Sequence, residues 1–240
     1  MTFKKYIPQN WFEKLRKLYW NSFDFIAFQS FSGEGEDMIL RKLFFYQSTG
    51  FYVDVGAYHP KKSSNTYHFY KKGWSGINID AMPGSMKLFQ QQRKRDINLE
   101  IPIGEDGEQL NFYIFKDQAL NGFENERLKS KDQSKPQNKL IQVIPMKTAS
   151  LTSILNQFLP VGQEIDFLDI DVEGGEAAVL HGLDFNKYRP KVILLELLDT
   201  ELQDLNNQPL AQYLFEKGYN IKAKTVNTFI FESIQNARKK

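Results

Sequence analysis

The sequence predicts an α/β fold in which a mostly parallel sheet is covered by helices on both faces. Short apolar runs typical of buried strands alternate with segments of helical spacing, and this alternation is typical of parallel sheets. The last two strand-like runs, within residues 219–233, are joined through Val226 and Asn227. They predict a final hairpin that adds an antiparallel strand to the sheet.

Length and composition indicate one large domain with an appendage. Of the 240 residues, 41% are hydrophobic and 25% are charged, which is ordinary for a globular protein. We expect an N-terminal helical extension at 1–30 and the main domain at 31–240. The net charge of +2 is too small to indicate nucleic acid as a partner, and the absence of cysteine excludes thiolate chemistry. No signal peptide is apparent and no transmembrane span is expected, so we expect a cytoplasmic protein.

The first part of the domain predicts three strands and three helices. Glu36 and Asp37 suit the first turn of a helix, where negative charge is favourable, and Gly73 is placed to end another. In chain order the predicted elements are a helix at 35–45, a strand at 50–56, a helix at 65–74, a strand at 75–81, a helix at 84–96 and a strand at 97–104.

The middle of the chain is less regular. Residues 105–115 predict a hairpin with Asp106 and Gly107 at its turn. The polar segment 116–139 predicts a long loop, which is either a lid or a solvated connection. The remaining predicted elements are a capped helix at 150–159, a strand at 165–176, a helix at 177–183, a strand at 190–197 and a helix at 209–219.

Residues 10–28 form an aromatic and basic stretch with helical spacing. The apolar residues that recur among its lysines and arginines are Trp11, Leu15, Leu18, Tyr19 and Ile26. Such a face usually packs across its own domain. The alternatives are a contact between two copies in a homo-oligomer and a peripheral contact with a membrane surface.

The predicted strands end in acids or glycine, and in an open α/β sheet ligands bind beyond those ends. The loop after the first strand has only Gly56 where a dinucleotide fingerprint has three glycines. Asp80 ends the second strand, where an acid can accept hydrogen bonds from both ribose hydroxyls. Capping or simple solvation is the alternative for Asp54 and Asp80. Taken together, the strand ends favour an adenosine joined to a group less anionic than pyrophosphate, as in S-adenosylmethionine.

Four stretches resemble the FkbM family of S-adenosylmethionine-dependent methyltransferases, and the resemblance extends over about residues 30–232. It implies a class I methyltransferase (Rossmann-like) fold and methyl transfer to a hydroxyl of a sugar, glycan or secondary metabolite. The matching stretches are "SGEGEDMIL" at 32–40, "GFYVDVGAYHPKKSSNTYHFYKKGWSGINIDAMPGS" at 50–85, "IDFLDIDVEGGEAAVLHGLDF" at 165–185 and "RPKVILLEL" at 189–197.

The resemblance also implies which residues contact the cofactor. Asp80 takes the ribose, Ala81 lies beside the adenine, and Glu36 meets the amino-acid end. Many relatives have Asn-x-Gly where this chain has Tyr58, His59 and Pro60, so we interpret His59 as a rigid loop residue and not as a catalyst. The remaining implied cofactor residues are Asp54, Gly56, Ala57, Tyr58, His59, Asn65 and Thr66.

Three carboxylates are candidates for catalysis, because a hydroxyl acceptor must lose its proton. Asp171 and Glu173 follow the fourth strand and Glu196 ends the fifth, so they should converge beside the cofactor. Asp171 and Glu196 could hold a divalent cation such as Mg²⁺. Alternatively, Asp171 or Glu173 could act as a general base or only orient substrate. Alternatively, the acids near Glu173 only stabilise a helix N-terminus.

Two other functions remain open from the sequence. A nicotinamide-dependent oxidoreductase is disfavoured by the missing glycines and the final hairpin. A non-catalytic adaptor would keep the fold and use 10–28 and the basic loop to bind a membrane, glycan or partner.

Overall fold

The computed structural model describes residues 8–22, 27–117, 120–123 and 135–237. The chain divides into two compact units, Met1–Ser30 and Phe31–Lys240. The first contains helix α1 (Gln9–Ser22), which begins where the carbonyl of Pro8 accepts the amides of Trp11 and Phe12. All other described helices and strands belong to the second unit.

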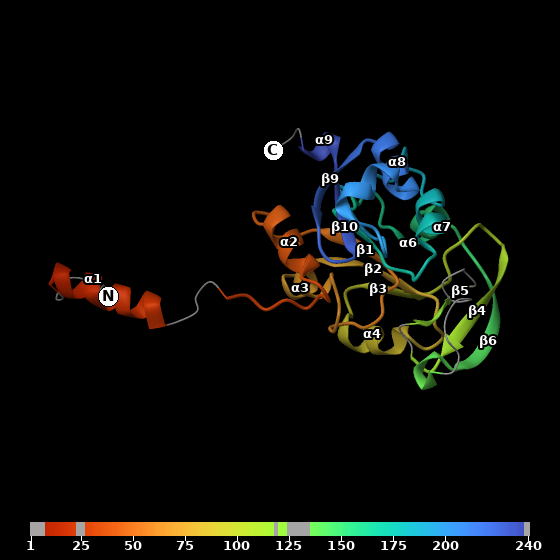
Figure 1. The fold of residues 1–240 in the computed structure, drawn as a ribbon, viewed down its shortest axis with the longest axis horizontal. Coiled ribbons are helices and arrows are strands. Elements are labelled where there is room, and N and C mark those ends of the chain that lie inside the picture. Colours follow the sequence, from red (N-terminus) through yellow and green to blue (C-terminus); the bar gives the residue numbers. More distant parts are fainter. Residues whose placement is uncertain (1–7, 23–26, 118–119, 124–134, 238–240) are drawn as a thin grey trace. The chain divides into compact units, whose positions relative to one another are not determined.

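The second unit is built on a sheet that, within the described residues, has seven strands in the order β3-β2-β1-β7-β8-β10-β9. The first five strands of this order are parallel, and β10 runs antiparallel to both β8 and β9. This confirms the predicted fold class, a mostly parallel sheet with an antiparallel strand from the final hairpin (Figure 1). The strands are β1 (Phe51–Val55), β2 (Ser75–Asp80), β3 (Ile97–Glu100), β7 (Phe167–Ile170), β8 (Val192–Glu196), β9 (Tyr219–Lys224) and β10 (Thr228–Ser233).

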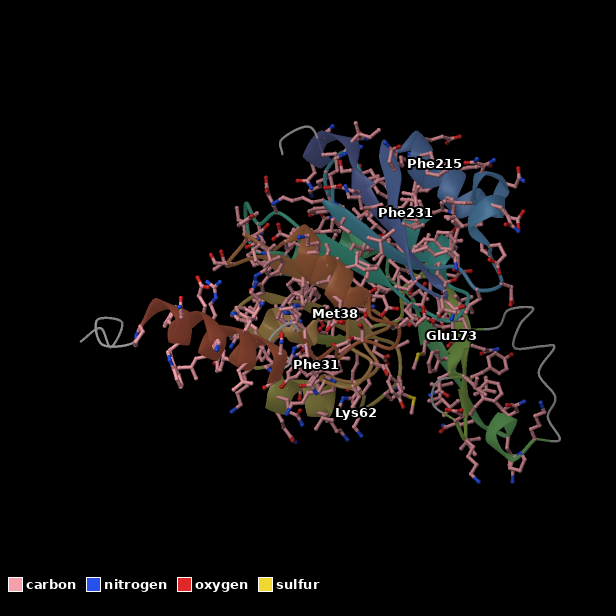
Figure 2. The ribbon with its side chains drawn as sticks, turned by 60° about the vertical axis from the view of Figure 1, so that its left-hand side comes forward. Phe31, Met38, Lys62, Glu173, Phe215 and Phe231 are labelled. Carbon is pink, nitrogen blue, oxygen red and sulfur yellow. The ribbon has the colours of Figure 1, made fainter. Side chains whose placement is uncertain are left out.

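Helices cover both faces of this sheet, because alternate strand residues point to opposite sides. Tyr52 and Phe167 pack with Leu40 and Phe69 on the face of α2 and α3. On the other face the apolar strand residues pack against α6, α7 and α8, and Phe215 of α8 meets Phe231 of β10 with ring centroids 6.0 Å apart (Figure 2). The helices are α2 (Glu36–Leu43), α3 (Tyr67–Lys71), α4 (Met86–Gln92), α6 (Leu151–Phe158), α7 (Glu176–His181), α8 (Pro209–Glu216) and α9 (Ile234–Ala237), with 3-10 turns η3 (Pro136–Asn138) and η4 (Leu202–Asn207).

The middle of the chain forms a second, smaller sheet of three strands in the order β5-β4-β6. These are β4 (Gln109–Phe115), β5 (Gly122–Phe123) and β6 (Leu140–Lys147), paired antiparallel. The predicted hairpin at 105–115 is therefore wrong, since β4 pairs with β5 and β6 and not with the residues before Asp106. Asp106 instead accepts hydrogen bonds from the backbone of Ser150 and the hydroxyls of Ser150 and Ser153.

The predicted loop at 116–139 contains β5 and η3, so it is not wholly irregular. Residues 118–119 and 124–134 of this segment lie outside the described part of the chain. The predicted helix at 84–96 ends earlier, at Gln92, and the next four residues form a turn closed by the bond from the amide of Asp96 to the carbonyl of Arg93. Ser150 caps α6 as expected, since its hydroxyl accepts the amide of Ser153.

Candidate active site

A cavity of about 740 Å³ lies beyond the carboxyl ends of β1, β2 and β7. The strand order reverses between β1 and β7, and open α/β sheets bind ligands at such a point. Phe112 and Phe123 of the small sheet also line the cavity, with ring centroids 5.3 Å apart. The predicted site residues in its wall are Asp54, Gly56, Ala57, Tyr58, His59, Asn65, Asp80, Ala81, Asp171 and Glu173.

Asp54 and Asp80 end adjacent strands and face this cavity. Asp54 accepts a hydrogen bond of 3.0 Å from the hydroxyl of Thr66. Asp80 accepts the amide of Met82 at 2.6 Å, which fixes the turn after β2. Burial raises the pKa of each carboxyl to about 6, although Arg93 opposes the shift at Asp54 and the Met82 amide opposes it at Asp80. A hydrogen-bond donor therefore stabilises the ionised form of either group more than it stabilises that of a surface acid.

Asp169 is a buried acid of the cavity wall that the sequence analysis did not select. It lies opposite Asp54 in the register of β1 and β7. Burial, reinforced by the charges of Asp54 and Asp171, raises its pKa well above the usual value, and a hydrogen bond with Asn65 opposes this. The signal was present in the sequence, because both strands have Asp as their next-to-last residue.

Gly56 has a positive φ of 94°. A Cβ at this position would lie 1.7 Å from the carbonyl oxygen of Asp171. The glycine is therefore required by the close approach of two protein segments, the end of β1 and the chain after β7. The same residue also lines the cavity, so a ligand can reach the backbone there.

The turn after Gly56 is shaped by the side chain of His59. Its Nδ1 atom accepts the amides of Lys61 and Lys62, both at 3.0 Å. Burial and these two lysines lower its pKa, which keeps the ring neutral. In this geometry the imidazole organises its own loop, while Tyr58 is 55% exposed in the cavity wall.

Two residues that were expected to contact the cofactor are not among the residues that line this cavity. Thr66, expected in the pocket wall, is fully buried behind Asp54. Glu36, expected at the amino-acid end of the cofactor, has a carboxylate that accepts the amide of Glu34 at 3.0 Å and the hydroxyl of Thr228 at 3.3 Å. Glu36 therefore helps to tie the segment before α2 to the turn between β9 and β10.

Arg93 is a fully buried residue that the sequence analysis missed. Its guanidinium donates to the carboxylate of Asp96 at 2.9 Å, the hydroxyl of Tyr52 at 2.9 Å, the hydroxyl of Thr66 at 2.8 Å and the carbonyl of Pro60 at 2.8 Å. It thus fixes the Pro60 turn and, through Thr66, the carboxylate of Asp54. In the sequence, a run of lysines and arginines has no signal that identifies which of these residues will be buried in the folded protein.

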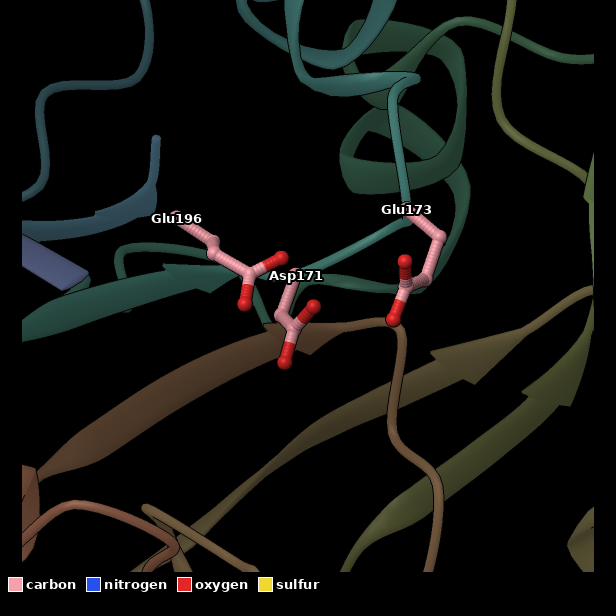
Figure 3. Close-up of side chains that lie close together, drawn as sticks. All are labelled: Asp171, Glu173 and Glu196. Atoms are coloured by element: carbon pink, nitrogen blue, oxygen red, sulfur yellow. The ribbon is translucent and has the colours of Figure 1, made fainter. Parts of the chain in front are cut away.

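Asp171, Glu173 and Glu196 converge, as predicted, at the carboxyl ends of β7 and β8 (Figure 3). One carboxylate oxygen of each lies within 4.8 Å of the others. Asp171 is exposed to the cavity, yet the surrounding protein desolvates it and raises its pKa to about 6. Burial and the neighbouring charge of Asp171 raise the pKa of Glu196 to about 9. The two groups are hydrogen-bonded, and these directions place the proton on Glu196 and the charge on Asp171.

The conformation of the loop after β7 determines where the side chains of Asp171 and Glu173 lie. Glu173 has a left-handed backbone with φ 54°, which is uncommon for a residue other than glycine. Glu176 holds the loop, because its carboxylate accepts the amides of Val172 at 3.3 Å and Gly174 at 3.0 Å. Only Glu176 belongs to the first turn of α7, so helix stabilisation does not account for Asp171 or Glu173.

Three carboxylates supply the oxygen ligands that a hard divalent cation prefers. A cation at this position would have to displace the proton of Glu196, whose second oxygen is buried without a hydrogen-bond partner. The other two histidines do not belong to the cavity wall. His68 has a pKa lowered by burial to about 4, and His181 packs on the ring of Tyr213.

The comparisons with known proteins identify a family. The family model described as the methyltransferase FkbM domain matches residues 54–221. Among solved structures, the TehB-like SAM-dependent methyltransferase from Corynebacterium glutamicum is 11% identical with a TM-score of 0.39, covering 94% of this chain and 97% of that chain. No curated protein matches the chain.

Proposed function

Because the chain belongs to the FkbM family of methyltransferases, we propose that it transfers the methyl group of S-adenosylmethionine to a hydroxyl oxygen of a sugar, glycan or secondary metabolite. The observation that carries this proposal is one cavity in which Asp80 and the Gly56 loop meet Asp171, whose carboxylate lies beside that of Glu196. A nucleoside site and a proton acceptor are thereby next to each other.

The cofactor is assigned to the part of the cavity beside β1 and β2. The carboxylate of Asp80 accepts hydrogen bonds from the ribose hydroxyls, and burial, which raises its pKa to about 6, makes such donors more stabilising there. The backbone at Gly56 and Ala57 lies beside the methionine portion. Ile101, Ile103 and the two phenylalanines of the small sheet supply apolar surface for the adenine. The volume of about 740 Å³ is in the range of sites for small molecules.

The carboxylates perform the proton transfer. The acceptor oxygen attacks the methyl carbon, the carbon–sulfur bond breaks, and sulfur keeps the electron pair as a neutral thioether. The hydroxyl proton passes to Asp171, which is ionised while the neighbouring Glu196 is protonated. Alignment of the hydroxyl with the methyl group is the other contribution that such a site makes. The alternative is a divalent cation on the three carboxylates that acidifies the hydroxyl.

Binding of the cofactor is tested by thermal shift. S-adenosylmethionine is expected to raise the melting temperature of the chain, because it binds only the folded state. NAD is expected to leave it unchanged. The reverse result would contradict the proposal in favour of an oxidoreductase.

Catalysis is tested by release of S-adenosylhomocysteine across sugar and lipid-linked acceptors, with magnesium and with EDTA. Cofactor binding without product from any acceptor would favour an adaptor. Activity that EDTA leaves unchanged would exclude the cation.

We expect Asp171→Asn to lower kcat by about 10²- to 10⁴-fold, the usual contribution of a general base. The amide keeps the shape of the side chain but cannot accept the proton. Asp204→Asn, at an exposed position of η4, is the matched control and should keep full activity. A decrease of less than tenfold would assign Asp171 to substrate orientation instead.

A further inference from the structure

Helix α1 carries an apolar stripe. Trp11, Leu15 and Leu18 lie within about 60° of one another around the helix axis, because each residue advances the helix by about 100°. Their side chains are 65%, 48% and 66% exposed. A single helix has no second layer of its own against which to bury such a stripe.

Cations lie on both sides of this stripe. At helical spacing, Lys14 is next to Leu18 on one side and Arg16 lies beyond Leu15 on the other. Lys17 adds a third cation, and the single acid of the helix, Glu13, is on the side away from the stripe. The helix therefore combines an apolar stripe containing Trp11 with an opposite face that carries Arg16, Lys17, Glu13 and Trp20.

We propose that α1 lies on the surface of an anionic lipid bilayer, with Trp11, Leu15 and Leu18 in the boundary between headgroups and acyl chains. Interfacial helices combine a basic face with an apolar face rich in Trp and Leu. The flanking cations complement the negative lipid headgroups. This proposal does not depend on methyl transfer and goes beyond it.

Two other arrangements fit the helix less well. Its 14 residues are too few to cross a membrane, and none of the helices in the described residues has the length and apolar character for a span. In a pair of such helices from two copies, Lys14 and Arg16 would border the contact, where like charges repel. An anionic lipid surface attracts these cations, and its acyl chains accept the apolar stripe. It therefore matches both the charged and the apolar side chains of the helix.

The test is sedimentation of the full chain with vesicles of phosphatidylcholine alone and of phosphatidylcholine with phosphatidylserine. We expect at least about tenfold stronger binding to the anionic vesicles, since each cation near such a surface contributes. Added salt should weaken the binding, because it screens the charges. Equal binding to both vesicles, or binding to neither, would overturn the proposal.

Two variants test whether α1 is the part of the chain that binds the vesicles. The triple substitution Trp11→Ser, Leu15→Ser and Leu18→Ser should abolish it, and Lys14→Glu with Arg16→Glu should remove the preference for anionic lipid. The matched control replaces three exposed apolar residues of the second unit by serine and should bind like the unchanged chain; these are Val161, Leu202 and Val226.

Melting of each variant, followed by circular dichroism, shows whether the second unit is still folded. Anionic binding that survives the triple substitution in α1 would overturn the proposal. So would a dimer in solution that the same substitution dissociates, because the stripe would then belong to a second copy.

Discussion

At the scale of single residues, desolvation is the main cause of the raised pKa values of the acids at the candidate site. Burial raises the pKa of Asp54, Asp80 and Asp171 to about 6 and that of Glu196 to about 9. Each of these groups is harder to ionise in the folded chain than in the unfolded chain. Such values are common where side chains are arranged for a ligand and not for the stability of the free protein.

The first prediction concerns the pH dependence of stability. The pKa of Glu196 rises from 4.5 to about 9 on folding, so between these values the folded state binds the proton more tightly than the unfolded state. The free energy of unfolding therefore decreases as the pH rises through this window. Glu196→Gln has no proton to lose and should flatten the decrease, as measured by melting at a series of pH values.

The control for this prediction is Glu201→Gln, which changes an exposed glutamate. It should follow the unchanged chain at every pH. If Glu196→Gln also follows the unchanged chain, Glu196 does not hold its proton in the folded state.

The second prediction concerns Gly56. Gly56→Ala should destabilise the chain by about 2–5 kcal/mol, because it combines a positive φ with a clash against the carbonyl of Asp171. Gly73→Ala is a matched control, since its φ of 98° is similar but nothing lies within 4 Å of the added Cβ. Chemical denaturation measures both. Equal losses would mean that the clash relaxes without cost.

The Gly56 position also shows what a local motif does and does not contain. The sequence predicts that Gly56 lets the cofactor approach the backbone, whereas the structure shows a protein group in close approach to this glycine. The approaching group is the backbone of Asp171, which is more than 100 residues away in the chain. A motif indicates that space is needed, but only the packed strands show which atoms occupy it.

At the scale of elements, Arg93 joins four segments around the cavity. It binds β1 through Tyr52, the Pro60 turn, the residue before α3 through Thr66, and the turn after α4 through Asp96. Because the guanidinium is planar with five donors, one side chain satisfies all four acceptors. The turn at residues 58–60 is therefore fixed from inside the protein as well as by His59.

The third prediction follows from this network. Arg93→Lys should destabilise the chain by about 3–5 kcal/mol, because an ammonium cannot reach all four acceptors and leaves a buried acid poorly paired. It should also weaken the binding of S-adenosylmethionine, since the Asp54 side of the cavity is released. Denaturation and calorimetric titration measure the two effects.

Arg95→Lys is the control for this prediction, because Arg95 lies in the same turn with an exposed side chain that contacts the carbonyl of Tyr70. It should change neither stability nor cofactor affinity appreciably. Comparable losses in both variants would contradict the assigned role of Arg93.

Prediction of the elements succeeded where apolar runs were continuous and failed in the small sheet. The strands buried on both faces, such as β1 and β8, are apolar except for one acid near the carboxyl end, and they are easy to recognise. β5 has two residues and β6 is largely exposed, so neither has a clear pattern. β4 was assigned to a local hairpin because a turn signal preceded it, although its partners lie later in the chain.

At the scale of the whole molecule, the three buried apolar clusters are composed only of residues from Leu40 onward. Our last prediction is that a chain of residues 31–240 folds as the full chain does. Its melting temperature and its affinity for S-adenosylmethionine should match those of the full chain, while binding to anionic vesicles should be lost. A large decrease in melting temperature would show that the first unit contributes to the stability of the second.

The sequence by itself determined the α/β class, the order of the main strands along the chain, the family and the positions of Asp54, Asp80, Asp171 and Glu196 near strand ends. These properties follow from local patterns and from the rule that parallel strands end at one edge of a sheet. Only the tertiary structure decided that Glu36 and Thr66 face other protein groups, that Arg93 is buried, and that the small sheet closes the cavity. These depend on contacts between distant segments, because the burial and pKa of a side chain are set by what packs around it.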